Sequence, residues 1–315
     1  MFLAKEVKKR IHNDQAMNEK TIQVASGLLA YWDSGLQERD QPVVLFLHGN
    51  SNSKEMYASL FPYFVEQDYR CLAVDLLGHG QSGPAQSKEK YSYHDQAVAM
   101  SEFLQMLNLK DVHVFGASHG GHIGYELLSN DRLLSLTTIG APPISKVKHE
   151  GQDTYDFPNW FKFAGGDQAQ HEEPGYDIMT LMQKDKFTPD EAKFWIAGAG
   201  ITEKVPEYTS QLKAALETHP DARPALFSAC MAGIGCDHNQ AIRHTEKKVC
   251  LLVGEHDHID LEKVEAFANS AGEQVSFQAI DYGSHYAMFG ESSLEFKNVL
   301  SEILTSLQSS SPRPH

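Results

Sequence analysis

Short apolar runs alternate with helical stretches along most of the chain, and this alternation restricts the possible folds more than any other feature. The clearest runs lie at residues 43–47, 71–74 and 112–115. Helical stretches are predicted between them, over about 54–67, 95–108 and 120–129. A continuous apolar run is typical of a strand buried on both faces. The sequence therefore predicts an α/β fold with a mostly parallel central sheet and helices on both faces.

The same pattern continues at both ends of the chain and breaks in the middle. Residues 21–33 read as an antiparallel hairpin, and a further strand is predicted at 136–139. From Pro143 to about residue 243 the strand periodicity disappears, and helix-like pieces occur at 189–199 and 206–217. A structureless loop of that length is rare, so an inserted helical segment is expected. The remaining predicted elements are a strand at 249–253, a helix at 259–271, a strand at 274–280 and a helix at 291–308.

Composition excludes several classes of protein. The 315 residues include 27 Lys plus Arg against 42 Asp plus Glu, a net charge of -15 that repels nucleic acid and anionic lipid. No window resembles a signal peptide or a membrane span. The four cysteines include no C-x-x-C pair, which argues against a disulfide scaffold. We expect a globular protein of a reducing cytoplasm, with neither nucleic acid nor a membrane as partner.

The strongest chemical signal is the sequence Gly116-Ala117-Ser118-His119-Gly120, between a buried strand and a helix. This is G-x-S-x-G in the context that a nucleophilic serine requires, on a sharp turn whose glycines permit close packing. The following helix N-terminus favours a developing negative charge. A glycine-rich connection with an incidental serine is the alternative for this motif alone, and the rest of the chain has to decide.

A serine nucleophile needs a histidine base, and that histidine needs a carboxylate to orient it. Asp257 follows the strand at 249–253, and His285 follows the strand at 274–280. Both therefore lie at the carboxyl edge of the predicted sheet, in the chain order Ser, acid, His. Glu255 is the competing carboxylate, and Asp281 is a weaker one. The backbone N–H groups of Asn50 and His119 are the candidate oxyanion donors.

Two other patterns suggest a phosphate-binding turn and a metal site. The turn at 75–82 is rich in glycine after a strand, but it lacks the GK[ST] ending and the G-x-G-x-x-G spacing, so we interpret it as structural. The run from Glu255 to His258 concentrates metal-ligand side chains, and His119 and His122 have helical i,i+3 spacing. We expect these histidines to pack rather than to bind a metal, and we expect no metal and no cofactor.

Taken together, these motifs resemble the α/β-hydrolase superfamily along nearly the whole chain. They are the residues at 48–50 (HGN), 75–82 (DLLGHGQS), 116–121 (GASHGG), 254–257 (GEHD) and 283–285 (GSH). A closer similarity is to the serine-dependent N-acyl homoserine lactone lactonases and related esterases, carried by 48–51, 115–124, 140–143, 233–235 and 239–240. The resemblance implies Ser118 as nucleophile, Asp257 and His285 as its partners, and Asn50 in contact with substrate. His119 departs from the family, in which an apolar residue is common at this place.

The element pattern and the composition of the tail also predict the organisation of the chain. Residues 1–143 and 244–308 would form the hydrolase core, 144–243 an inserted helical lid, and 309–315 a disordered tail. Substrate would be a small ester or lactone with an apolar acyl part, and the oligomeric state is unknown. The substrate-binding candidates are Asn50, Phe194, Trp195 and Phe227, with Trp160, Phe161 and Phe163 also in the lid, although ordinary packing is an alternative for each aromatic residue.

The expected activity is thus hydrolysis of carboxylic esters or lactones through an acyl-enzyme. Haloalkane dehalogenases and epoxide hydrolases share the fold but need Asp in place of Ser118, so they are set aside. Metal-dependent lactonases of another fold use H-x-H-x-D-H, which fails here at Val253 and Glu255. Two alternatives remain open: a cofactor-free dioxygenase of the same fold, and a ligand receptor that retains the triad without turnover.

Overall fold

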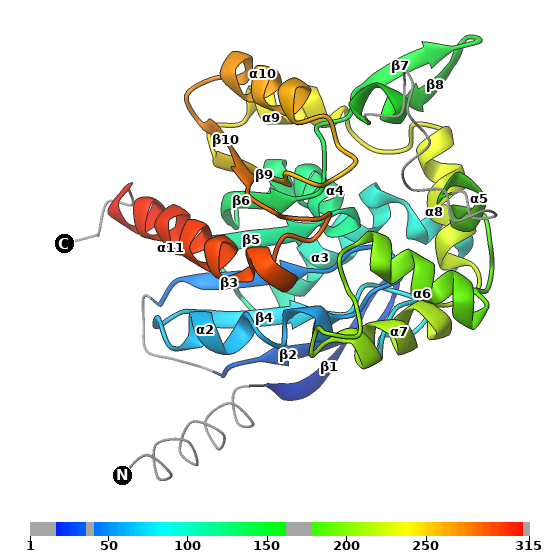
Figure 1. The fold of residues 1–315 in the computed structure, drawn as a ribbon, viewed down its shortest axis with the longest axis horizontal. Helices are drawn as coiled ribbons and strands as arrows, with labels where there is room; N and C mark the ends of the chain where they lie inside the picture. The colour runs from blue at the N-terminus through cyan, green and yellow to red at the C-terminus, as the bar shows by residue number, and fades with distance from the viewer. Residues whose placement is uncertain (1–16, 36–40, 162–177, 311–315) are drawn as a thin grey trace.

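The computed structural model describes residues 17–35, 41–161 and 178–310. An eight-stranded sheet runs through the centre of the molecule, with strand order β1-β2-β4-β3-β5-β6-β9-β10 (Figure 1). All neighbours from β4 to β10 pair in parallel, whereas β2 is antiparallel to both β1 and β4. The strands are β1 (Asn18–Val24), β2 (Gly27–Asp33), β3 (Val43–Leu47), β4 (Arg70–Val74), β5 (Val112–Ala117), β6 (Leu133–Ile139), β9 (Lys248–Gly254) and β10 (Val275–Ile280). The predicted α/β fold with a mostly parallel sheet is confirmed.

Helices cover both faces of this sheet because the central strands are apolar on both sides. All five residues of β3 and all six of β5 are buried. One face carries a buried cluster that includes Phe103 of α3 and Phe267 of α10, and the other a cluster that includes Phe64 of α2 and Phe296 of α11. The core helices are α2 (Phe61–Val65), α3 (Tyr93–Met106), α4 (His119–Glu126), α9 (His238–His244), α10 (Leu261–Ala271) and α11 (Ser293–Ser310).

The segment between β6 and β9 contains most of the remaining elements, which lie beyond one end of the sheet (Figure 1). It holds the hairpin β7 (Lys146–His149) and β8 (Gln152–Tyr155), then η4 (Phe157–Trp160), α5 (Ile178–Met182), α6 (Pro189–Gly198), α7 (Tyr208–Glu217) and α8 (Ala222–Met231). The helices predicted at 189–199 and 206–217 are present as α6 and α7. The prediction that strands are absent from this segment is wrong, because β7 and β8 pair through a turn at Gly151. Their residues are mostly exposed and polar, so they carry no apolar pattern.

Two helix predictions need correction at their ends. The helix expected over 54–67 is two short pieces, η1 (Lys54–Tyr57) and α2, separated at residues 58–60. Pro62 stands at the start of α2, and because it has no N–H it cannot continue a helix from the preceding turn. The closing helix α11 extends to Ser310, two residues beyond its predicted end. The short η2 (Lys88–Tyr91), η3 (Leu127–Ser129) and η7 (Gly290–Ser292) complete the described elements.

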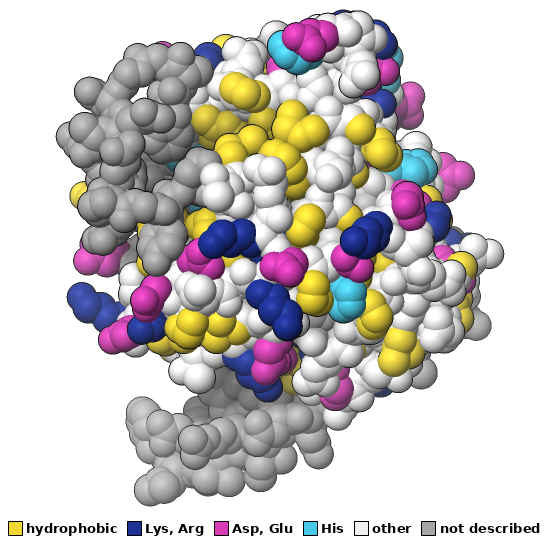
Figure 2. All heavy atoms as spheres, turned by 90° about the vertical axis from the view of Figure 1, so that its right-hand side faces the viewer, with side chains coloured by type: hydrophobic (Ala, Val, Ile, Leu, Met, Phe, Trp, Pro, Cys, Tyr) yellow, Lys and Arg dark blue, Asp and Glu magenta, His cyan; other side chains and the backbone are white. Residues whose placement is uncertain are grey.

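The described helices include none that is long and apolar enough to cross a bilayer. Figure 2 shows the face over the segment between β6 and β9, where charged side chains of both signs lie among exposed hydrophobic ones. Exposed apolar residues of this segment are Val147, Ile178, Met179, Met231 and Ile234.

Candidate active site

Ser118 occupies the turn between β5 and α4 with a backbone that few residues adopt, φ 47° and ψ -109°. The flanking glycines make this turn possible. A Cβ atom on Gly116 would lie 2.4 Å from the carbonyl oxygen of Gly120, and one on Gly120 would lie 2.1 Å from that of Leu47. Any side chain at either place would therefore push α4 away from the sheet. The result is a half-buried serine presented at the start of a helix.

Asp257 and His285 are hydrogen-bonded to each other. Nδ1 of His285 lies 3.1 Å from Oδ1 and 3.0 Å from Oδ2 of Asp257. The Asp257 side chain is fully buried, whereas that of His285 is 13% exposed. Burial alone would raise the pKa of Asp257, but the charges and hydrogen bonds of His285 and His258 hold it below its ordinary value. The carboxylate is thus ionised and holds Nδ1 of the imidazole.

The end of β6 contacts Ser118 through Ile139 and His285 through Gly140. The carbonyl oxygen of Ile139, at the end of β6, accepts a hydrogen bond of 2.8 Å from the N–H of Ser118. The next residue, Gly140, has φ +64°, and a Cβ atom on it would lie 2.8 Å from Cε1 of His285. One strand end therefore contacts both the serine backbone and the imidazole.

Tyr286, which was not predicted, connects the serine to the loop after β3. Its hydroxyl donates to Oδ1 of Asn52 at 3.0 Å, and it also hydrogen-bonds the side chain of Ser118. Burial raises the pKa of Tyr286, so the hydroxyl keeps its proton. Its place directly after His285 is the only sequence signal that could have identified it.

The two predicted oxyanion donors have no competing partner. Among the described residues, neither the N–H of Asn50 nor that of His119 donates a hydrogen bond. The loop that carries Asn50 is held from the other side: the side-chain oxygen of Gln211 in α7 accepts from Asn52 Nδ2 and from the N–H of Ser53, each at 3.1 Å. The buried guanidinium of Arg223 also donates to Ser51 at 3.1 Å. These contacts engage Ser51, Asn52 and Ser53 and do not involve the N–H of Asn50.

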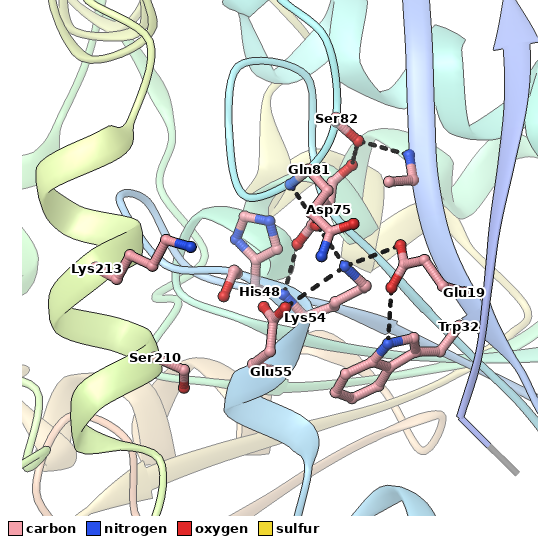
Figure 3. A network of polar contacts seen from close by, with 12 residues as sticks. Glu19, Trp32, His48, Lys54, Glu55, Asp75, Gln81, Ser82, Ser210 and Lys213 are labelled. Carbon is pink, nitrogen blue, oxygen red and sulfur yellow. Dashed lines mark hydrogen bonds and ion pairs between the residues drawn. The ribbon is translucent and has the colours of Figure 1, made fainter. Parts of the chain in front are cut away.

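A buried ion pair fixes this loop to the turn at 75–82. Figure 3 shows Lys54 between Asp75 and Glu19, with His48 beside them. Nζ of Lys54 lies 2.7 Å from Oδ2 of Asp75 and 3.2 Å from Oε1 of Glu19, and the Asp75 carboxylate also accepts the N–H of Gln81 at 2.8 Å. These contacts give the turn at 75–82 a structural role.

His48 adds a neutral contact between the same two loops. Its Nε2 accepts the N–H of Leu76 at 2.9 Å, and burial lowers the pKa of His48 to about 4. The imidazole is therefore uncharged at neutral pH and acts as an acceptor.

The side chain of Asn50 is occupied by protein contacts. Its Oδ1 lies 3.2 Å from Nε2 of His79, and its Nδ2 donates to the sulfur of Met182 in α5 at 3.1 Å. Trp195 of α6 donates to the carbonyl oxygen of Asn50 at 3.2 Å. Of the predicted aromatic residues, Trp195 contacts the loop that carries Asn50. Met182, which the sequence did not single out, contacts the same residue.

The other predicted aromatic residues lie in different places. Phe194 is half-buried against the core cluster on the α2 and α11 face. Phe227 lines a surface hollow of about 470 Å³ whose lining residues do not include Ser118, Asn50 or His285. Trp160 packs on Phe267 at 6.1 Å between ring centroids, whereas Phe163 lies outside the described residues.

Phe161 instead stacks on His258, with ring centroids 5.0 Å apart. The sequence indicates His258 only as a metal-ligand side chain. In the structure its Nδ1 lies 3.1 Å from Oδ1 of Asp257. Its ring stacks on that of His285 at 4.9 Å, so the Asp257 carboxylate contacts Nδ1 of two stacked imidazoles. Of the competing carboxylates, Glu255 is exposed and accepts the N–H of Tyr282, and Asp281 is exposed.

Two groups of described residues have metal-ligand geometry, with one ligand atom from each residue within 4.8 Å of the others: Asp257 with His258 and His285, and Glu126 with Cys236 and His238. The first is the acid and histidine pair itself plus one further histidine. Of the pair His119 and His122, the His119 ring nitrogens have no hydrogen-bond partner among the described residues, and Nδ1 of His122 faces Nδ1 of His238 at 3.3 Å. Burial lowers the pKa of His119 to about 3, so this ring is neutral.

Comparison with known proteins shows a similarity to the α/β-hydrolase fold. Residues 42–179 match the family model of the alpha/beta hydrolase fold. A haloalkane dehalogenase of Mesorhizobium japonicum is 30% identical over 123 residues, 38% of each chain. A bifunctional esterase/perhydrolase of Acinetobacter calcoaceticus is 30% identical over 115 residues, 36% of this chain and 41% of that protein. The matched part spans less than half of the length of these curated relatives.

Solved structures match over nearly the whole chain. A variant of the N-acyl homoserine lactonase AidH in complex with N-hexanoyl homoserine has a TM-score of 0.75 and 23% identity, covering 95% of this chain and 99% of that one. At that identity the similarity establishes the fold.

Proposed function

We propose that this chain, which has the α/β-hydrolase fold, hydrolyses carboxylic esters or lactones with Ser118 as the nucleophile. The observation that carries the proposal is the bidentate contact of Asp257 with Nδ1 of His285, beside a serine held at positive φ. Because the carboxylate holds the proton on Nδ1, Nε2 of the imidazole is the free acceptor. That tautomer is the one able to take the proton of a serine hydroxyl.

In the proposed reaction Ser118 Oγ attacks the acyl carbon while His285 takes its proton. The carbonyl oxygen becomes an oxyanion, which the N–H groups of Asn50 and His119 stabilise. His285 then protonates the leaving alcohol, or the ring oxygen of a lactone. Water, deprotonated by the same imidazole, releases the acid from the acyl-enzyme.

The residue at position 118 favours esterase chemistry over dehalogenase chemistry. Its identity as serine supports acyl transfer, because the carboxylate nucleophile that a dehalogenase needs is absent at this position. The carbonyl and side chain of Asn50 contact Trp195 and Met182, two large apolar residues suited to line an acyl pocket. The matched lactonase complex, with its acyl homoserine ligand, supports a lactone among the substrates. We propose that residues 144–243 act as the lid over this pocket.

The test is labelling with a fluorophosphonate together with turnover of p-nitrophenyl esters. Ser118→Ala should lose both labelling and turnover while the circular dichroism spectrum is unchanged. Ser228→Ala, an exposed serine of α8, is the matched control and should retain both. Near-normal rates in Ser118→Ala would disprove the assignment.

The same assay separates the alternatives. A hydroxyl nucleophile with a histidine base needs no Lewis acid, so hydrolysis should continue in EDTA. A stoichiometric burst without steady-state turnover for every ester and lactone would instead support a receptor that retains the triad. Oxygen consumption with an aromatic substrate, retained in Ser118→Ala, would support the cofactor-free dioxygenase.

A further inference from the structure

We propose that Glu126, Cys236 and His238 form a binding site for a thiophilic divalent metal ion such as Zn²⁺, distinct from the site of Ser118. One ligand atom from each of these residues lies within 4.8 Å of the other two. Thiolate, imidazole and carboxylate together form a donor set that suits Zn²⁺ or Co²⁺ and not the oxygen-seeking Mg²⁺ or Ca²⁺.

The three residues are brought together by tightly packed backbone. Glu126 ends α4, Cys236 lies in the turn before α9, and His238 is the first residue of α9. The N–H of Cys236 donates to Oε1 of Glu126 at 2.6 Å. Gly235 has φ +127°, and a Cβ atom on it would lie 2.2 Å from the same oxygen. Only glycine permits this approach, so the group is built into the fold and is not a chance meeting of surface side chains.

Nε2 of His238 is the observation that points to a ligand. The His238 side chain is fully buried, and this nitrogen has no hydrogen-bond partner among the residues that the structure describes. Oε1 of Glu126 lies 3.4 Å from this nitrogen, within ion-pair distance but outside hydrogen-bond geometry. A buried polar atom without a partner costs free energy, and such atoms in native proteins usually have a water, an ion or a function. A metal ion between Nε2, the thiol and the carboxylate would satisfy it.

The other side of the imidazole is oriented as in protein metal sites. Nδ1 of His238 lies 3.3 Å from Nδ1 of His122, which can accept its proton and leave the lone pair of Nε2 free for a metal. The ring of Tyr155 stacks on His238 at 5.3 Å, and the hydroxyl of Tyr155 donates to the carbonyl oxygen of Cys236 at 2.9 Å. Tyr155 therefore fixes two of the three proposed ligands at once.

Charge and protons balance in this arrangement. Without metal, burial and the neighbouring Glu126 raise the pKa of Cys236, so the thiol holds its proton. Binding of a divalent ion forms a metal–sulfur bond and releases that proton to solvent. The thiolate and the Glu126 carboxylate then supply two negative charges against two positive ones. The fourth position is open to water or to His94, whose Nδ1 lies 3.2 Å from Oε2 of Glu126.

The site would tie the end of the helix that begins at Ser118 to α9, which leads into β9. Its expected effect is on stability and not on the chemical step, because its ligands lie at the opposite end of α4 from Ser118. The proposal therefore stands or falls independently of the proposed ester hydrolysis.

The test is a Co²⁺ titration of the full-length, chelator-treated protein, followed by absorption spectroscopy. One equivalent of Co²⁺ should produce a thiolate-to-cobalt charge-transfer band in the near ultraviolet. Cys236→Ser should abolish that band, and His238→Gln should weaken binding roughly tenfold or more. Cys230→Ser is the matched control, since Cys230 is a buried cysteine outside the group, and it should bind as the wild type does.

Two further measurements complete the design. Zn²⁺ should raise the melting temperature of the wild type and of Cys230→Ser, but not of Cys236→Ser. His258→Gln removes a ligand of the other group and should keep the charge-transfer band. Absence of a thiolate band in the wild type, or equal Co²⁺ affinity in Cys236→Ser, would overturn the proposal.

Discussion

Gly140 and His285 are in direct contact: a Cβ atom on Gly140 would lie 2.8 Å from Cε1 and 2.9 Å from Nδ1 of His285. The imidazole thus packs on bare backbone at the end of β6. Since Asp257 holds the same ring through Nδ1, the orientation of His285 is fixed from two sides. Proton transfer from a serine depends on that orientation. We therefore expect Gly140 to matter for positioning His285 as Asp257 does.

Gly140→Ala should reduce kcat/KM for an ester by about 100-fold or more, because displacement of a catalytic group by about 1 Å costs that much. Gly151→Ala is the matched control. Gly151 also has positive φ, +83°, but nothing lies within 4 Å of its Cβ position. Both variants place an alanine at positive φ and so carry similar backbone strain. Their free energies of unfolding in urea should therefore differ less than their kcat/KM values. Equal rates in the two variants would show that the contact does not position His285.

Asp257→Asn should lower kcat by about 10³- to 10⁴-fold, because an amide supports the wrong imidazole tautomer. Glu255→Gln should change kcat little, since this exposed carboxylate accepts a backbone N–H of Tyr282. Steady-state kinetics with p-nitrophenyl butyrate compares them directly. The opposite ranking would reassign the acid.

Asn50→Ala should weaken lactone hydrolysis more than hydrolysis of an acyl-matched aryl ester. The substitution removes the side chain that separates His79 from Met182, while the backbone N–H proposed for the oxyanion is kept. In the wild type, kcat/KM should rise roughly fourfold for each added acyl methylene until the pocket is full, at about 0.8 kcal/mol each. A homoserine lactone series measured beside aryl esters checks both. Good ester turnover without ring opening at any length would leave an esterase.

Stability should fall steeply below neutral pH because of the buried histidines. Burial lowers the pKa of His48 and of His113 to about 4, and that of His119 to about 3. In the unfolded chain these groups bind protons near pH 6.5, so the unfolded state takes up more protons as the pH falls. Their contribution is complete above about pH 6.5 and is lost towards pH 4.

Urea unfolding between pH 4 and 8 measures this slope. His113→Gln should reduce the slope by about 1.4 kcal/mol per pH unit between about pH 4 and 6.5, the effect of one proton. His149→Gln, at an exposed position, is the control and should leave the slope unchanged. An unchanged slope in His113→Gln would show that this histidine is protonated in the folded state.

The sheet and the serine turn were predictable because their causes are local. Five consecutive apolar residues at 43–47 identify β3, and the glycines around Ser118 identify the turn without reference to the rest of the chain. From strand positions alone, Asp257 and His285 were placed at the same sheet edge, and the family resemblance selected Asp257 over Glu255. That Asp257 and not Glu255 faces His285 depends on how the loop after β9 is folded, which no periodicity reports.

The contacts that sequence alone did not predict join residues far apart in the chain. His258 stacks on His285 and Tyr286 bonds Asn52, pairs separated by 27 and 234 positions. Nδ1 of His122 contacts Nδ1 of His238, which lies 116 positions further along the chain. Each residue by itself is ordinary for a packed interior, and only the folded chain shows that their polar atoms meet.

The pairing of β6 with β9 has a consequence for how this protein can change. Ser135 pairs with Lys248, so two adjacent strands are separated by more than a hundred residues that leave the sheet and return to the same place. The closure entropy of such an excursion grows only with the logarithm of its length, about 0.6 kcal/mol for each doubling. Insertions, deletions or exchange of the whole segment therefore leave strand register and the Ser118 turn in place. The segment outside the sheet can therefore change in length or sequence while the strands that position Ser118, Asp257 and His285 keep their pairing.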